Sequence, residues 1–306
     1  MPRISNQFLD CVVYLYPSEA EAEAEDGSRI GGSGFLVGIY LNPPFNTYAL
    51  RVLVTNKHIV DNGNMVARIN TLDGGKAIIA MDEENWIFSA TGDDLGICPI
   101  KVNPAVHKHN YVPTWTFVTK KLLGEFDVGP GDDVFFVGRF IDREGRQQNL
   151  PSARFGNISQ MPIEPVILEG GVKQDSFMIE ARSIAGYSGS PVFLHFIPQP
   201  GLPPNMPEGA RLSMPDFILK RQFTQYGIPY EPYLLGIDYC HIFSKDQVFN
   251  RHTDKPHDDW YVKSNTGMMG VIPAWKLAAM LEQPEMKSII ESMRALLPIA
   301  RPPDDM

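Results

Sequence analysis

Residues 186–193 read GYSGSPVF, and the interpretation of the whole chain depends on this short stretch. Two glycines flank Ser188, which is the composition of a tight turn, and a proline then leads into apolar residues that predict a buried strand. A serine at such a turn is either an ordinary turn residue or a nucleophile. A nucleophilic serine also needs a base and groups that stabilise an oxyanion. Whether Ser188 is a nucleophile therefore depends on whether the rest of the chain supplies these groups.

The composition is that of a soluble globular protein, because 43% of the 306 residues are hydrophobic and 21% are charged. This length suits one large domain or two of moderate size. The formal net charge of −9 argues against nucleic acid or an anionic membrane as a partner, since both require a basic face. The sequence shows neither a signal peptide nor an apolar run long enough to span a membrane, and we therefore expect a cytoplasmic protein.

The cysteines and histidines indicate neither a disulfide framework nor a metal site. Cys11, Cys98 and Cys240 are widely spaced in apolar, strand-like segments, which predicts buried reduced thiols. His107 and His109 lie in a polar, proline-flanked stretch, and a solvated loop is the favoured interpretation. We therefore expect no metal and no organic cofactor.

Short apolar runs separated by turns fill most of the chain and predict about a dozen strands. An acidic stretch at 17–29 predicts a solvated hairpin tip, and 103–113 is the best candidate for a linker. Near the C-terminus, apolar residues recur every three or four positions, which predicts an amphipathic helix that is broken at Pro284. This order of elements predicts an all-β fold of two barrels or sandwiches, followed by C-terminal helices.

The chain offers one histidine and one carboxylate that could activate Ser188. His58 follows the apolar run RVLVT within TNKHIV, where a turn can hold its ring in a fixed place. Asp94 stands at the start of another apolar strand in GDDLGICPI, so we expect its side chain to be partly buried, whereas Asp93 should face solvent. A partly buried carboxylate needs a donor, and a histidine Nδ1–H is a suitable one.

The segments GSGFLVG, TNKHIV, DDLGI and GYSGSP occur in the order in which the trypsin/chymotrypsin-like serine peptidases carry their marker segments, and they resemble those segments. VGPGDDVFFVG and IEARSIAGYSGSPVF resemble most closely the bacterial members that lack an activation peptide. The resemblance covers roughly residues 8–281. It leaves the proline-rich insertion at 198–232 and the last helix unexplained.

The resemblance implies two Greek-key, six-stranded β-barrels. The expected boundaries are 1–112 for the barrel that carries His58 and Asp94, 113–272 for the barrel that carries Ser188, and 273–306 for the helices. Ser188 would attack a peptide carbonyl, His58 would transfer the proton, and Asp94 would orient the imidazole. The backbone N–H groups of Gly186 and Ser188 would form the oxyanion hole.

Two residues beside Ser188 depart from the family pattern. Ser190 replaces a common glycine, which keeps a small side chain and should leave the chemistry unchanged. Tyr187 stands where activation-dependent members place an aspartate that pairs with a newly cut N-terminus. We therefore expect a peptidase that is active as translated or is gated in another way.

The resemblance also indicates which residues line the substrate pocket. The expected wall residues are Arg182, Ser183, Ile184, Asp238, Tyr239, Cys240 and His241, with Met268, Met269 and Gly270 as further candidates. A pocket that selects basic side chains needs a buried carboxylate at its base, and the matching position falls near Arg182. Apolar or small side chains are therefore expected at P1, the substrate residue whose carbonyl is attacked.

Other interpretations remain open. The chain could be a catalytically silent or gated binding module with a peptidase fold, a scaffold whose insertion at 198–232 docks partners, or an esterase with the same triad. The expected partners are a protein or peptide substrate and a regulatory protein, since the insertion and the terminal helix suggest an element that controls access.

Overall fold

A computed structural model describes residues 4–24, 31–42, 48–167, 173–195 and 232–297. The N-terminal half forms one sheet in the order β5-β4-β1-β2-β3-β7-β6, and β8 pairs in parallel with β2. Its strands are β1 (Val12–Tyr16), β2 (Gly32–Tyr40), β3 (Ala49–Thr55), β4 (Val66–Asn70), β5 (Lys76–Ala80), β6 (Ile87–Phe88), β7 (Gly96–Pro99) and β8 (Val112–Pro113). This sheet has eight strands where six were expected, because the short strands β6 and β8 extend it.

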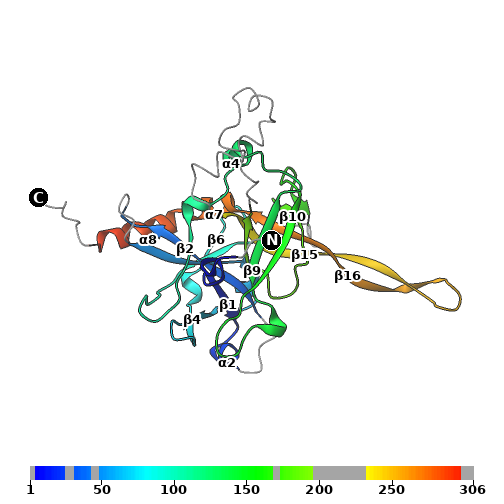
Figure 1. Cartoon of the computed structure of the whole chain (residues 1–306), viewed down its shortest axis with the longest axis horizontal. Coiled ribbons are helices and arrows are strands. Elements are labelled where there is room, and N and C mark those ends of the chain that lie inside the picture. The colour runs from blue at the N-terminus through cyan, green and yellow to red at the C-terminus, as the bar shows by residue number, and fades with distance from the viewer. Residues whose placement is uncertain (1–3, 25–30, 43–47, 168–172, 196–231, 298–306) are drawn as a thin grey trace, which may run out of the picture.

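The C-terminal half forms a closed barrel in the order β10-β13-β16-β15-β14-β9. Its strands are β9 (Asp133–Gly138), β10 (Ser152–Gln160), β13 (Phe177–Glu180), β14 (Pro191–Leu194), β15 (Tyr233–Phe249) and β16 (Pro256–Pro273). A separate small pair consists of β11 (Val166–Ile167) and β12 (Lys173–Gln174). The expected six-stranded barrel is thus confirmed for this half (Figure 1).

The helices are short except at the C-terminal end. They are α1 (Asn6–Leu9), α2 (Glu19–Glu23), α3 (Lys57–Asp61), α4 (Lys120–Glu125), α7 (Ala274–Leu281) and α8 (Pro284–Ala295), with single 3₁₀ turns at Glu83–Asn85, Thr114–Thr116 and Ile141–Arg143. The predicted break is confirmed, since α8 begins at Pro284. No helix among the described residues is long and apolar enough to cross a membrane.

The acidic stretch is not only a hairpin tip, because part of it forms helix α2. Ser18 caps this helix by accepting a hydrogen bond from the Glu21 N–H, and Ala22 is fully buried. Glu19 and Glu21 lie in the first turn, where the helix dipole favours negative charge. Repulsion between the carboxylates was therefore outweighed by a cap, the dipole and one buried alanine.

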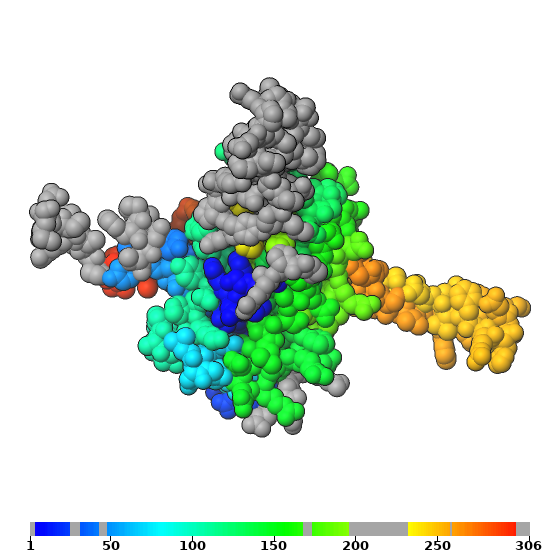
Figure 2. Space-filling model, in the orientation of Figure 1, coloured from blue at the N-terminus to red at the C-terminus, as the bar shows by residue number. Residues whose placement is uncertain are grey.

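Strands β15 and β16 continue beyond the barrel as a two-stranded arm, formed by 243–249 and 256–265, that projects from the body (Figures 1 and 2). In this part of the chain the two strands pair with each other only. Several of the largest exposed apolar side chains lie on the arm, namely Phe243, Phe249, Trp260, Tyr261 and Val262. Sequence reasoning did not predict this feature.

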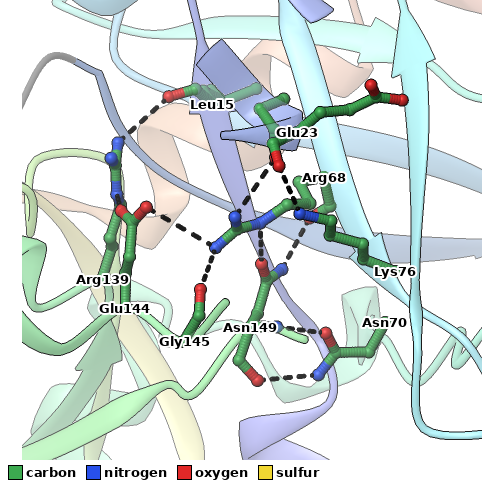
Figure 3. Close-up of polar contacts among 10 residues, drawn as sticks. Leu15, Glu23, Arg68, Asn70, Lys76, Arg139, Glu144, Gly145 and Asn149 are labelled. Carbon is green, nitrogen blue, oxygen red and sulfur yellow. Dashed lines mark hydrogen bonds and ion pairs between the residues drawn. The ribbon is translucent and has the colours of Figure 1, made fainter. Parts of the chain in front are cut away.

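A buried polar cluster joins the two halves of the chain (Figure 3). Arg68, on β4, donates to Asn149 Oδ1 over 2.7 Å, and Arg139, at the end of β9, donates to Glu144 Oε2 over 2.5 Å. The carbonyl of Leu15 on β1 accepts a further bond from Arg139. Both arginines are completely buried, so the halves are connected by charged groups as well as by apolar packing.

The expected linker at 103–113 packs against the first sheet. Leu72 N–H donates to Val106 O, and Lys108 N–H donates to Asn70 O. The insertion at 198–232 lies almost entirely outside the described residues, as do the last residues of the chain. The division into three parts at 112 and 272 stays a prediction.

Candidate active site

His58 and Asp94 come together at the edge of the first sheet. His58 lies in the first turn of α3, directly after β3, and Asp94 precedes β7, the neighbour of β3. The His58 Nδ1 lies 2.6 Å from Asp94 Oδ2, and the His58 backbone N–H donates to Asp94 Oδ1 over 2.8 Å. Both carboxylate oxygens therefore fix the position of this histidine.

This contact determines what the imidazole can do. A carboxylate that faces Nδ1 favours the tautomer with the proton on Nδ1, which leaves Nε2 with a free lone pair. The side chains of His58 and Asp94 are 40% and 23% exposed, so the pair is open on one side. The arrangement suits a general base whose orientation is fixed.

Asp94 is held in place through its backbone. Asn56 donates from its side chain to Asp94 O over 3.1 Å, and the Asp94 N–H donates to Gln174 Oε1 over 3.0 Å. Gln174 belongs to β12, in the second half of the chain, and it also donates to Asp93 Oδ1. No sequence signal pointed to Gln174 as a supporting residue.

Asp93 is not the solvent-facing residue that the sequence suggested. Its side chain is 6% exposed, and it accepts from Thr91 and Gln174 and forms an ion pair with Lys276 at 3.2 Å. The expectation failed because Lys276, on α7, is far away in sequence and supplies a cation that makes burial of Asp93 favourable.

Ser188 lies on a turn that packs against the first sheet. Its carbonyl accepts a hydrogen bond from the Ser33 N–H over 2.9 Å. A side chain at Gly32 would lie 2.7 Å from Ile59 Cδ1 and 3.1 Å from Ser188 O, so the segments after His58 and around Ser188 converge on this glycine. Ser188 and His58 make no direct hydrogen bond to each other, a contact that often tightens only when substrate binds.

The turn before Ser188 is tight and requires glycine at position 186. Tyr187 N–H donates to Ile184 O, and Gly186 has φ +98°, as in a type II turn. A Cβ at Gly186 would lie 2.8 Å from Arg139 O, so glycine is required here for space as well as for conformation. The N–H groups of Gly186 and Ser188 donate no hydrogen bond to any described residue and are available to a ligand.

Ser33 is a supporting residue that sequence reasoning missed. Its hydroxyl donates to Gly186 O over 2.7 Å and accepts from the Arg139 N–H over 2.8 Å. Ser33 is fully buried on β2, in the GSG segment, where the absence of a side chain at Gly32 leaves room for the approaching Ser188 turn. The GSG segment is the sequence feature that could have pointed to Ser33 as a supporting residue.

Tyr187 anchors the same turn from the barrel side. Its ring is completely buried, its hydroxyl donates to Ser152 Oγ over 2.7 Å, and it accepts from Arg154 Nε over 3.0 Å. These partners come from β10 of the same barrel. The turn is therefore anchored within its own barrel through Tyr187.

The expected pocket residues divide into three groups. Ser183 and Asp238 meet directly, because Ser183 Oγ donates to Asp238 Oδ2 over 2.7 Å. The side chains of Tyr239 and Met269 belong to the hydrophobic core. The side chains that are half-buried or exposed are those of Arg182, Ile184, Cys240, His241 and Met268.

Asp238 is the most unusual of these residues. Its side chain is 1% exposed, and burial raises the pKa of this carboxyl to about 7, although the Ser183 hydroxyl, His58 and the Cys240 N–H lower it. Among the described residues, no Lys or Arg forms an ion pair with Asp238.

The cysteines are free thiols. Cys11 and Cys98 are buried, as expected, whereas Cys240 is half-buried. In the described part of the chain, no group of three or more His, Cys, Asp or Glu side chains could hold a metal ion.

Comparison with known proteins supports the fold. The chain has a trypsin-like protease fold. The protease domain of MamO from Magnetospirillum magneticum superposes with a TM-score of 0.50 at 14% identity, covering 90% of this chain and 98% of that domain. Weaker matches, both with a TM-score of 0.44 at 14% identity, are Deg5, over 77% of this chain and 81% of that one, and an inactive form of Rv3671c from M. tuberculosis, over 96% and 91%.

No protein-family model and no curated protein sequence matches this chain. The expected fold class is thus confirmed by structure: two mainly antiparallel sheets, one of them a closed barrel, with C-terminal helices in the chymotrypsin-like arrangement.

Proposed function

We propose that the chain is a serine endopeptidase that cleaves protein substrates through His58, Asp94 and Ser188. The observation that carries the proposal is the double contact of Asp94 with the His58 ring and backbone. This contact leaves the Nε2 atom of His58 free to act as the base. His58 lies beside the part of the first sheet against which the Ser188 turn packs.

In the proposed reaction, His58 Nε2 takes the proton from Ser188 Oγ while the oxygen attacks the peptide carbonyl. The negative charge on the carbonyl oxygen is stabilised by the N–H groups of Gly186 and Ser188. His58 then donates its proton to the leaving amine, and an acyl-enzyme forms on Ser188. Water activated by His58 hydrolyses this ester and restores the serine. No metal or organic cofactor takes part in this scheme.

The proposal is tested by labelling the purified chain with a fluorophosphonate, which reacts with activated serines. We expect the wild type to react and Ser188→Ala and His58→Ala not to react. Ser190→Ala is the matched control, because Ser190 is only two residues away and its hydroxyl has no hydrogen-bond partner. Labelling that persists in Ser188→Ala would contradict the assignment of the nucleophile.

The second candidate function is a catalytically silent or gated binding module with the same fold. The observation that favours it is the projecting arm, where Trp260 is 66% and Tyr261 59% exposed. Aromatic side chains at such positions are enriched in protein–protein interfaces. A wild-type chain that is folded but unreactive toward the fluorophosphonate supports this function.

The proposal also covers where the protein acts and what controls it. We place it in the cytoplasm and infer that a regulatory protein controls it, because an unrestrained peptidase there would be harmful. Full and indiscriminate cleavage of proteins by the isolated chain would contradict this regulation.

A further inference from the structure

A groove of about 840 Å³ runs between helix α8 and the edge of the first sheet. Its helical wall includes Glu285, Ile289 and Met293, which are four residues apart and therefore lie on one face of α8. The facing wall is formed mainly by residues 84–88 and 99–101 of the first sheet. The described residues that line the groove include none of the three candidate catalytic residues, so it is a second site.

Both walls of the groove are fixed in place. On α8, Met286 is fully buried in the core, and Arg294 Nε donates to Leu41 O over 3.2 Å. On the sheet side, Trp86 is 6% exposed and packs in the core beneath the sheet. A groove between fixed walls can accept a ligand with little reorganisation.

The groove is apolar inside and acidic at its rim. Ile87, Phe88 and Ile289 are half-buried in it, and Met293 is 37% exposed. Glu84 and Glu285 line it from opposite walls, are exposed, and form no ion pair with any described residue. An apolar surface bordered by charged residues is typical of a site that binds another protein.

The charge around the groove indicates what kind of partner fits. Asp82 and Glu83 are also exposed and directly precede Glu84. Lys101 is the one cation among the described residues that line the groove, so negative charge predominates. A partner that carries basic residues beside its apolar contact residues is therefore complementary.

The geometry of the groove favours a helical partner over an extended one. Strand β6 has two residues, and Phe88 O already accepts a hydrogen bond from Gln283 Nε2, so this edge offers little to an added strand. The helical wall from Glu285 to Met293 spans about 12 Å, which is the length of roughly two helical turns. An amphipathic helix presents apolar side chains over such a length.

We propose that this groove binds an amphipathic helix of a partner protein. The apolar face of that helix lies against α8 and β6, and its flanking lysine or arginine residues face Glu84 and Glu285. Binding in the groove does not depend on the proposed function. Its effect on Ser188, which is derived next, rests on that function.

The groove is connected to Asp94 through Gln283, which lines it and directly precedes α8. Gln283 Oε1 accepts from the Ala90 N–H over 3.0 Å, and its Nε2 donates to Phe88 O over 3.1 Å. Phe88 and Ala90 begin the segment 88–94, which ends at Asp94. The side chain that holds the start of this segment is therefore part of the proposed binding site.

The other end of the segment 88–94 is held by the same pair of helices. Lys276, on α7, forms the ion pair with Asp93, the residue before Asp94. A helix bound in the groove covers the hydrogen bonds of Gln283 and shields them from water, which strengthens them. Asp94 is then held more firmly against His58, and we expect Ser188 to react faster.

Calorimetry with a designed peptide tests the binding. The probe is a helical peptide of leucine and lysine, about 14 residues long, with all leucines on one face. We expect the wild type to bind it and not to bind the same peptide with glutamate in place of lysine. Glu84→Gln/Glu285→Gln should weaken binding about tenfold. Glu164→Gln/Glu291→Gln makes the same change of charge at exposed positions outside the groove and should bind as the wild type does.

Met293→Lys tests the apolar wall. It places a cation in the groove, and the last turn of α8 tolerates this cation because the helix dipole favours it there. We expect binding of the lysine peptide to weaken at least about tenfold. Unchanged binding in Met293→Lys, or equal binding by the two double glutamine variants, would overturn the proposal. Binding that occurs only after residues 298–306 are removed would also overturn it, because the groove would then belong to the chain's own C-terminus.

Fluorophosphonate labelling with and without the lysine peptide tests the effect on Ser188. We expect saturating peptide to raise the labelling rate at least about fivefold. Gln283→Met keeps a side chain of similar length and removes both hydrogen bonds, so it should bind the peptide without a rise in rate. Peptide that binds without changing the wild-type rate refutes the connection to Asp94. If Ser188 stays unlabelled with and without peptide, the peptidase assignment fails, and calorimetry still decides whether the groove binds a basic helix.

Discussion

Ser33 on the first sheet directly supports Gly186 in the second half of the chain, through a hydrogen bond of 2.7 Å from its hydroxyl to the Gly186 carbonyl. Its backbone N–H supports the Ser188 carbonyl at the same time. One buried residue thus holds both positions whose N–H groups would form the oxyanion hole. The relationship explains how two separate sheets produce a single site.

Ser33→Ala tests this positioning role. We expect kcat to fall about 10- to 100-fold with little change in KM, because the variant loosens the oxyanion turn without removing a substrate contact. Steady-state kinetics and the rate of fluorophosphonate labelling measure the effect. Ser190→Ala removes a nearby buried hydroxyl that has no partner and should leave kcat unchanged. A variant whose only change is a lower free energy of unfolding would argue for a purely structural role.

Asp94→Asn tests a role in catalysis, and Asp93→Asn, at the adjacent position, tests a role in stability. We expect Asp94→Asn to lower kcat by about 10⁴, because an amide no longer selects the His58 tautomer that leaves Nε2 free. Asp93→Asn should instead lower the free energy of unfolding, since it leaves Lys276 with one carboxylate partner, Asp175. The measurements are kcat and urea denaturation for both variants. Equal kinetic losses in the two variants would contradict the assignment of Asp94.

Much of this site could be predicted from sequence because its residues lie in local patterns. The Ser188 turn is defined by its glycines, His58 follows an apolar strand, and Asp94 precedes another one. Each pattern is set by the nearest few residues, so it is visible without the fold. The break at Pro284 was predictable for the same reason, since proline acts on its own helix.

The features that were not predicted depend on contacts between distant residues. Asp93 is buried because Lys276 reaches it, and Gln174 supports Asp94 from the other half of the chain. The arm was missed because a periodicity of two predicts a strand but not whether neighbouring strands cover it. The contact between Asp238 and Ser183 was not predicted because only the barrel pairing brings these two residues together.

Gly186→Ala tests the oxyanion turn itself. The residue has φ +98°, and an added Cβ would press on Arg139 O, so we expect the turn to change and kcat to fall at least about 100-fold. Gly63→Ala is the control, because Gly63 has φ +80° but open space around the added carbon. It should lose about 1 kcal/mol of stability and no activity. Full activity in Gly186→Ala would contradict the proposed hole.

Glu144→Gln tests the buried cluster that joins the halves. Glu144 is 4% exposed and contacts both Arg139 and Arg68, so removing its charge leaves two buried guanidinium groups poorly compensated. We expect the free energy of unfolding to fall by about 3 kcal/mol in urea denaturation. Glu285→Gln, at an exposed position in the first turn of α8, should change it by less than about 1 kcal/mol. A neutral effect at Glu144 would mean that packing alone holds the halves together.

The buried carboxyl of Asp238 should make the free energy of unfolding depend on pH. Burial raises its pKa from 3.8 in the unfolded chain to about 7 in the folded protein. Between these values the unfolded state has released the proton while the folded state keeps it, so the contribution of Asp238 to stability falls as the pH rises from about 4 to 7. Asp238→Asn does not titrate and should therefore be more stable than the wild type at pH 8, by up to about 4 kcal/mol, and the advantage should be lost near pH 4.

Urea denaturation of both proteins at pH 4, 6 and 8 measures this difference. The Ser183 hydroxyl, His58 and the Cys240 N–H are the groups that lower the pKa of Asp238 and so favour its ionised form. The comparison is therefore repeated in a His58→Ala background, where the loss of that interaction should raise the pKa of Asp238 further and enlarge the gap at pH 8. A difference between wild type and Asp238→Asn that does not change with pH would show that the carboxyl has the same pKa in the folded and unfolded states.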